Sequence, residues 1–174
     1  MKIENIVCSG SLNCQLDLKD LSNKCPSVQY GVKRYPGAYL TVDGYKTTLY
    51  RTGKYIMQGL KSFDEIEPEF QRICGVLSEY VELSSPELPS IRNMVCSSDY
   101  GRELDLHLVY SELLITDYDV QYEPECFPGM ILRIEGITFN VFQSGRFIIL
   151  GCTSKVCAIQ AEKRILTLFS AIGA

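Results

Sequence analysis

Alternating apolar and polar residues predict β-strands in both halves of the chain. In the segment 3–9, Ile6 and Cys8 share one face, whereas Asn5 and Val7 fall on the other. Segments that suit a strand recur at 38–42, 46–51, 55–58, 91–97, 130–134, 138–143 and 147–150. Asp-Gly at 43–44 is a strong hairpin signal, so we expect neighbouring strands to pair antiparallel.

Apolar residues spaced by threes and fours predict helices between these strands. A short helix is expected at 16–24, where Pro26 stops it, and a longer one from near Glu67 to about Tyr80. A closing helix should cover 154–170. Its expected apolar stripe is Val156, Ile159, Ile165, Leu168 and Phe169, with Glu162, Lys163 and Arg164 facing water.

One sequence unit occurs twice. Residues 28–37 match residues 120–129, 92 positions later, and in both segments an aromatic residue stands directly before Pro-Gly. Upstream of these segments the two halves match at a slightly shorter offset of 88. We therefore expect a first repeat at 1–84 and a second at 90–174, which form one intertwined body.

The face of the sheet that helices leave uncovered is the informative one. Helices too few to cover both faces must cover one, and the other should then be polar. Here the open face would instead show Val7, Ile56, Val95, Phe142, Ile148 and Leu150. An exposed apolar surface of that breadth usually has a partner.

Composition excludes several other functions. The formal charge of −4 argues against a protein that binds polyanions over its whole surface. Eight cysteines without a C-x-x-C pair, and one histidine, favour buried thiols in a reducing compartment over a zinc site. No convergent catalytic set is present, so we expect neither an enzyme nor a cofactor. His107 should lie on a helix surface, and Asp17 and Asp105 should start helices. We also expect a soluble, non-secreted protein that does not enter a membrane.

At 91–95, 122–129 and 142–146, and again at 3–7 and 16–19, the chain resembles the TATA-box-binding protein family. Each motif alone is weak, but together they stand in register across a duplication. The resemblance implies an α+β saddle, in which two pseudo-symmetric repeats form one curved antiparallel sheet with helices on the convex face. It also implies a general transcription initiation factor that binds A·T-rich promoter DNA in the minor groove and bends it.

The resemblance assigns DNA-binding roles residue by residue. Asn5 and Asn93 would donate hydrogen bonds to minor-groove acceptors, and Phe127 and Phe142 would wedge between base steps. The resemblance implies apolar contacts to the groove floor for Val7, Ile56, Val95 and Ile148. Tyr35 and Tyr50 would occupy the wedge positions of the first repeat, and Gln58 and Leu150 the ends of the last strands. Phosphate or sugar contacts are implied for Thr52, Lys54, Arg133, Ser144 and Arg146.

The resemblance also implies protein partners. Glu123 and Glu125 match an acidic loop that relatives offer to a transcription factor IIB-type protein, and other general transcription factors would join. The expected location is the nucleus, or the cytoplasm or a viral factory for an archaeal or viral protein. A homodimer in the absence of DNA stays open.

Some positions depart from the family pattern. Both wedge positions of the first repeat are tyrosines, and Thr48 and Asn140 replace apolar residues. A hydroxyl between base pairs needs a hydrogen-bond partner, so kinking should be weaker at that end. The alternative function is therefore a protein-interaction module that has lost much of its DNA affinity.

Overall fold

The computed structural model describes residues 1–31 and 35–173, which divide into two compact units. The first unit is Asn5–Arg92, and the second unit combines Met1–Glu4 with Asn93–Ala174. Strands β1 (Lys2–Ser11) and β6 (Ser90–Asp99) each contribute residues to both units. The division into repeats at 1–84 and 90–174 stays a prediction, and residues 32–34 of the first Pro-Gly segment lie outside the described residues.

The first unit contains one end of the sheet and a long helix. After β1 come α1 (Leu18–Lys24), β2 (Val28–Gln29), β3 (Ala38–Val42), β4 (Tyr45–Leu49), β5 (Lys54–Leu60), the short 3-10 helix η2 (Phe63–Glu65) and α2 (Ile66–Ser78). The strands are hydrogen-bonded in the order β2-β3-β4-β5-β1. Pro68 lies in the first turn of α2, where its missing N–H costs no helical hydrogen bond.

The second unit repeats this order of elements. After β6 come α3 (Leu106–Ile115), β7 (Asp119–Gln121), β8 (Met130–Ile134), β9 (Ile137–Val141), β10 (Arg146–Cys152) and α4 (Lys155–Ala171). Its strands are ordered β6-β10-β9-β8-β7, and all ten strands belong to one open antiparallel sheet. The predicted sheet and its alternation with helices are confirmed, with β3 and β8 at the predicted residues.

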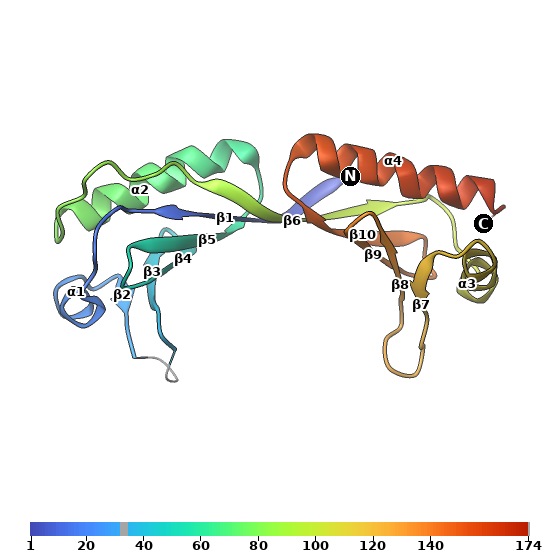
Figure 1. Cartoon of the computed structure of the whole chain (residues 1–174), viewed down its shortest axis with the longest axis horizontal. Coiled ribbons are helices and arrows are strands. Elements are labelled where there is room, and N and C mark those ends of the chain that lie inside the picture. The colour runs from blue at the N-terminus through green and yellow to red at the C-terminus, as the bar shows by residue number, and fades with distance from the viewer. Residues whose placement is uncertain (32–34, 174) are drawn as a thin grey trace. The chain divides into compact units, whose positions relative to one another are not determined.

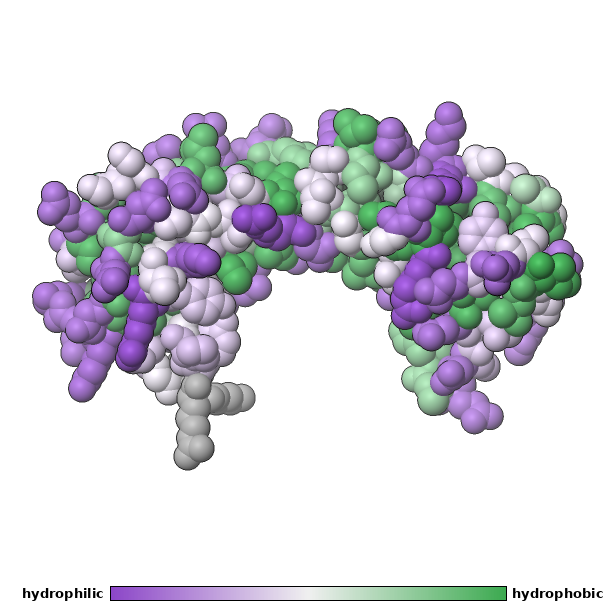
Figure 2. All heavy atoms as spheres, in the orientation of Figure 1, coloured by the Kyte–Doolittle hydropathy of each residue, from purple (hydrophilic) through white to green (hydrophobic). Residues whose placement is uncertain are grey.

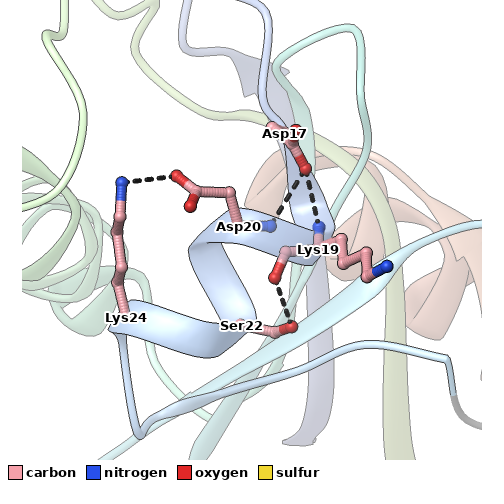
Figure 3. Close-up of polar contacts among 5 residues, drawn as sticks. All are labelled: Asp17, Lys19, Asp20, Ser22 and Lys24. Carbon is pink, nitrogen blue, oxygen red and sulfur yellow. Dashed lines mark hydrogen bonds and ion pairs between the residues drawn. The ribbon is translucent and has the colours of Figure 1, made fainter.

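Both short helices begin at an aspartate. The Asp17 carboxylate accepts hydrogen bonds from the backbone N–H groups of Lys19 and Asp20, which would otherwise lack a partner (Figure 3). Asp105 caps α3 in the same way, through the N–H groups of His107 and Leu108. The prediction that the two aspartates start helices is confirmed.

Each long helix covers one face of the sheet in its own unit (Figure 1). In the first unit Phe70 of α2 stacks on Tyr55 of β5, with 5.7 Å between ring centroids. In the second unit Phe169 of α4 meets Phe147 of β10 edge to face at 6.3 Å. Rings and aliphatic side chains between helix and sheet thus form the core of each unit. No helix in the described ranges is long and apolar enough to cross a membrane.

The predicted apolar stripe of the closing helix is wrong in part. Val156 is 63% exposed and Ile159 is 47% exposed, and Figure 2 shows hydrophobic atoms among hydrophilic ones over α4. The side of α4 that faces the sheet carries Ala158, Ala161, Ile165 and Phe169. Small alanines let the helix approach the strands closely, so the side of the helix that carries them is buried, and the side with the larger Val156 and Ile159 is not. Glu162, expected to face water, hydrogen-bonds Ser98 and pairs with the N-terminal amine.

Candidate nucleic-acid interface

In the first unit, the face of the sheet opposite α2 is open. On β5, Tyr55 and Met57 point into the core and are at most 1% exposed. Their neighbours point the other way, and Ile56 is half-buried while Lys54 and Gln58 are exposed. Strand β1 alternates in the same manner. The alternation predicted from the sequence therefore gives one helix-covered face and one open face.

In the second unit, the open face is built by the same alternation. Phe147 and Ile149 of β10 are fully buried, whereas Ile148 and Leu150 are half-buried and Arg146 is exposed. The predicted DNA-binding residues of both units are all half-buried or exposed: Asn5, Val7, Tyr35, Tyr50, Thr52, Lys54, Ile56, Gln58, Asn93, Val95, Phe127, Arg133, Phe142, Ser144, Arg146, Ile148 and Leu150. None is covered by a helix in the way that the core residues are, so each remains accessible to a ligand.

The two open-face asparagines are held in one orientation. Asn5 Oδ1 accepts a hydrogen bond of 2.8 Å from the backbone N–H of Gly59, and Asn93 Oδ1 accepts one of 3.0 Å from the N–H of Gly151. Because a backbone N–H can only donate, it fixes which end of each amide is the oxygen. The amide nitrogen, which can only donate, is the polar atom left for a ligand.

The glycines that hold these amides lie at irregularities in the sheet. The pairing of β1 with β5 shifts between Ile6 and Cys8, and the pairing of β10 with β6 shifts at the corresponding place. Such a bulge releases a backbone N–H from the ladder, and the asparagine accepts it. Gly59 and Gly151 have φ of +93° and +102°, which other residues rarely adopt. Sequence analysis assigns them no role, although the 92-residue offset relates one to the other.

Two aromatic pairs mark corresponding places in the units. Phe127 and Phe142 meet edge to face, with centroids 5.9 Å apart and planes at 62°. Tyr35 and Tyr50 are 6.5 Å apart, and their hydroxyl oxygens lie 2.8 Å from each other in a hydrogen bond. That hydrogen bond raises the pKa of the Tyr35 hydroxyl. The structure therefore pairs the residues that sequence analysis assigned to the wedge positions.

The Pro-Gly sequence after each first ring has a steric reason. A Cβ atom on Gly37 would lie 2.9 Å from the Tyr35 ring, and one on Gly129 would lie 2.8 Å from the Phe127 ring. Only glycine lets the ring fold back over the strand that follows. The repeated aromatic-Pro-Gly motif thus sets the position of one ring in each pair.

Two further residues on the open face of the first unit, Tyr39 and Lys46, were not among the predicted site residues. The Tyr39 ring stacks on Tyr35 with centroids 5.3 Å apart and planes at 9°. Lys46 Nζ lies 3.7 Å from the centroid of Tyr39, which is a cation–π contact. The second repeat has Ile131 and Thr138 at these places, so comparing the repeats position by position was the available signal.

Charges on the open faces are paired differently in the two units. Arg133 lies 3.2 Å from Asp119, and Arg146 lies 3.7 Å from Asp99. In the first unit Lys54 has no carboxylate within ion-pair distance, among the residues that the structure describes. The cations of the second unit are therefore partly neutralised before any ligand binds.

The predicted partner-binding glutamates lie on the loop between β7 and β8. Glu123 and Glu125 are exposed, and the Glu123 carbonyl accepts hydrogen bonds from the N–H groups of Cys126 and Phe127. The Tyr122 ring, directly before them, meets His107 of α3 edge to face at 5.1 Å. The turn and this ring contact thus fix where the two carboxylates emerge.

Other chemistry finds little support. In residues 1–31 and 35–173, no group of three or more His, Cys, Asp or Glu side chains could hold a metal ion. All eight cysteines are free thiols. Burial raises the pKa of Cys152 to about 12, so this thiol stays protonated at neutral pH and is a poor nucleophile. His107 is exposed on α3, as predicted.

Comparison with known proteins identifies close similarity over nearly the whole chain. The family model described as "Transcription factor TFIID (or TATA-binding protein, TBP)" matches residues 1–80 and 88–172. The TATA-box-binding protein of Pyrococcus abyssi is 33% identical over 171 residues, which cover 95% of this chain and 87% of the relative. The protein of that name from Archaeoglobus fulgidus is 29% identical over 179 residues, or 99% of this chain and 96% of the relative.

A solved structure shows the same fold. The structure titled "Methanococcus jannaschii TBP" superposes with a TM-score of 0.85, at 28% sequence identity, and the match covers 98% of each chain. This similarity confirms the fold class predicted from the sequence.

Proposed function

Because this chain belongs to the TATA-box-binding protein family, we propose that it is a general transcription initiation factor that binds A·T-rich promoter DNA in the minor groove and bends it. The observation that carries the proposal is the fixed orientation of Asn5 and Asn93. Each presents an uncharged donor on an open face. The minor groove of A·T and T·A pairs displays only acceptors, so these donors suit it.

Apolar side chains beside the asparagines favour the same base pairs. Val7 and Ile56 in the first unit, and Val95 and Ile148 in the second, are half-buried on the open faces. A G·C pair would place its exocyclic amine, a donor, against these side chains and against the amide donors. Losing the hydration of that amine without a new partner is unfavourable, so G·C pairs should be rejected.

The phenylalanine pair supplies the proposed bending. Phe127 and Phe142 carry no polar atom in their side chains, so they can enter between base pairs without leaving a group unsatisfied. Lys54, Arg133 and Arg146 would contact the phosphates, and Thr52 and Ser144 the sugars or phosphates.

Partner recruitment and location are also part of the proposal. The exposed carboxylates of Glu123 and Glu125 suit a basic surface on a transcription factor IIB-type protein. The expected compartment is the nucleus, or the cytoplasm of an archaeal cell. Glu123→Lys with Glu125→Lys should leave DNA binding intact and abolish the ternary complex in a gel-shift assay with that protein. Unchanged ternary complex formation would remove this part of the proposal.

Fluorescence anisotropy with three matched duplexes tests the DNA-binding proposal. The duplexes carry an A·T-rich element, a G·C-rich element, and the G·C-rich element with inosine in place of guanosine. Inosine lacks the minor-groove amine but keeps the major-groove pattern of guanosine. We expect tight binding to the A·T-rich and inosine duplexes and at least about tenfold weaker binding to the G·C-rich one.

Two further measurements make the test specific. Asn5→Ala with Asn93→Ala should weaken binding to the A·T-rich duplex, whereas Asn23→Ala, on the exposed side of α1, should not. Equal affinity of the wild-type protein for all three duplexes would overturn the DNA proposal. That outcome would favour the alternative, a protein-interaction module that uses the open faces for a protein or for a second copy.

A further inference from the structure

The first unit carries an aromatic arrangement that its counterpart lacks. We define the tyrosine cluster as Tyr35, Tyr39 and Tyr50 with Lys46, which lies over the Tyr39 ring. We propose that this cluster holds the DNA backbone without entering the base stack, so that the bound DNA is kinked only at the end that meets Phe127 and Phe142. The inference rests on the proposed function and goes beyond it, because it makes the two ends of the DNA site unequal.

The hydroxyl pair opposes insertion. Tyr35 and Tyr50 hydroxyls are hydrogen-bonded to each other at 2.8 Å, and both side chains are half-buried. Between two base pairs, both hydroxyls would lose water and face ring surfaces that neither donate nor accept a strong hydrogen bond. The two hydroxyls therefore have hydrogen-bond partners at the protein surface and would lack full hydrogen bonding between base pairs.

Stacking within the protein opposes insertion as well. The planes of Tyr35 and Tyr39 differ by 9°, so one face of the Tyr35 ring is already occupied. A ring inserted between two base pairs stacks through both of its faces, and here one of the two faces would first have to leave Tyr39. The ring of Tyr39 is itself capped by the Lys46 ammonium at 3.7 Å. Ring and ammonium thus restrain one another before DNA arrives.

The same cluster suits a phosphate. Lys46 is exposed, and within the described residues no carboxylate forms an ion pair with it. Its register partner across the sheet is Gln58, on the strand that also carries Lys54. Two ammonium groups on one open face provide point charges for the DNA backbone without any requirement for unstacking.

The phenylalanine pair has none of these restraints. Phe127 and Phe142 contact each other edge to face. The position that corresponds to Tyr39 in the second repeat is occupied by Ile131, which has no ring to stack on Phe127. The chemistry for entering a base stack is therefore present in the second repeat alone.

A duplex with a fluorescent base at both ends of the A·T-rich element tests the inference. We place 2-aminopurine at each terminal step, because its fluorescence rises when it unstacks, and donor and acceptor dyes on the duplex ends report the bend. Using both steps at once makes the result independent of the direction in which the protein binds. The wild-type protein should unstack one step, and Tyr35→Phe with Tyr50→Phe should unstack two, which gives about a twofold larger fluorescence rise and a larger bend.

The reverse exchange is the matched variant. Phe127→Tyr with Phe142→Tyr should bind the A·T-rich duplex with little fluorescence rise and a reduced bend. Lys46→Thr, which installs the residue of the second repeat, should reduce the slope of log affinity against log salt by about one. Circular dichroism melting of each variant confirms that it is folded.

The outcomes separate this inference from the proposed function. If the wild-type protein fails to prefer the A·T-rich duplex, the proposed function fails. If it prefers that duplex and already unstacks both steps, with no further rise in the Tyr→Phe variant, the inference is wrong and the proposed function stands. An unchanged salt slope for Lys46→Thr would likewise contradict the phosphate role of Lys46.

Discussion

The open faces of the two repeats have the same framework and different chemistry. Both place an asparagine at a bulge, held by a glycine N–H, with half-buried aliphatic residues beside it. The first repeat adds tyrosines, together with Lys46 and Lys54, which no carboxylate of the described residues pairs with, whereas the second adds phenylalanines and arginines that carboxylates partly neutralise. The duplicated backbone thus places equivalent positions on both open faces, and the side chains determine separately in each repeat what kind of contact those positions can make.

The hairpin glycines test whether the framework is equivalent in the two repeats. A Cβ on Gly53 would lie 2.1 Å from the Cys14 carbonyl oxygen, and one on Gly145 would lie 2.1 Å from that of Arg102. Gly53→Ala and Gly145→Ala should each lower the free energy of unfolding by about 4 kcal/mol, because backbone cannot move aside cheaply. Urea unfolding measures this. A large loss in only one repeat would show that the two frameworks differ in rigidity.

The asparagines should be equivalent for DNA binding. Asn5→Asp or Asn93→Asp keeps an oxygen for the glycine N–H but replaces the amide donor with a second oxygen, which faces groove acceptors. We expect each change to weaken binding to the A·T-rich duplex by roughly 100-fold, or about 3 kcal/mol. Anisotropy titrations measure the loss. Asn23→Asp is the charge-matched control, and a similar loss for that variant would point to net charge instead.

The charge difference between the repeats predicts a smaller effect. Asp99→Asn should release Arg146 for phosphate and remove a repulsive charge, so affinity should rise by about threefold at low salt. Because the interaction is exposed, the gain should fade as salt increases. Ser11→Asp at the corresponding place in the first repeat should weaken binding instead. An unchanged or lower affinity for Asp99→Asn, or an unchanged or higher affinity for Ser11→Asp, would contradict the asymmetry.

A buried glutamate in only one of the two long helices predicts the smallest effect. Glu69 of α2 is 3% exposed beside Arg72, whereas Ala161 occupies the corresponding place in α4. Burial raises the pKa of Glu69, although Arg72 opposes the shift. The protonated form is therefore favoured in the folded state, and its stabilisation is lost as pH rises through that pKa. The effect of Glu69→Gln on the free energy of unfolding should thus be more stabilising at pH 7 than at pH 4. Thermal melts should show a difference of less than about 1 kcal/mol between the two pH values. The opposite pH trend would show that the Arg72 ion pair dominates.

Much of the fold was predictable because the duplication supplied two independent versions of each signal. Hairpin glycines, strand alternation and the capping aspartates recur at constant offsets, so local chemistry determined the elements. The closing helix was harder to predict. Val156 and Ile159 look like core residues by size, but close packing selects Ala158 and Ala161, and packing distance is not visible in a hydrophobic pattern.

The positions of the predicted site residues followed from the pattern, but their pairings did not. Alternation alone put Asn5, Ile56 and Lys54 on the open face. The residues that orient these side chains come from other strands or from across a bulge: Gly59 donates a hydrogen bond to Asn5, and Tyr39 stacks on Tyr35. Such contacts depend on register, which tertiary structure fixes and a single segment does not reveal.

The bulge glycines also bear on whether the protein can distinguish the two orientations of a promoter element. In the proposed complex Asn5 and Asn93 offer the bases only N–H hydrogens, so these two residues cannot distinguish adenine from thymine. A promoter element turned end for end would look the same there. The orientation of the promoter would then have to be read by the two aromatic pairs, which carry hydroxyl groups in one repeat and only hydrocarbon in the other.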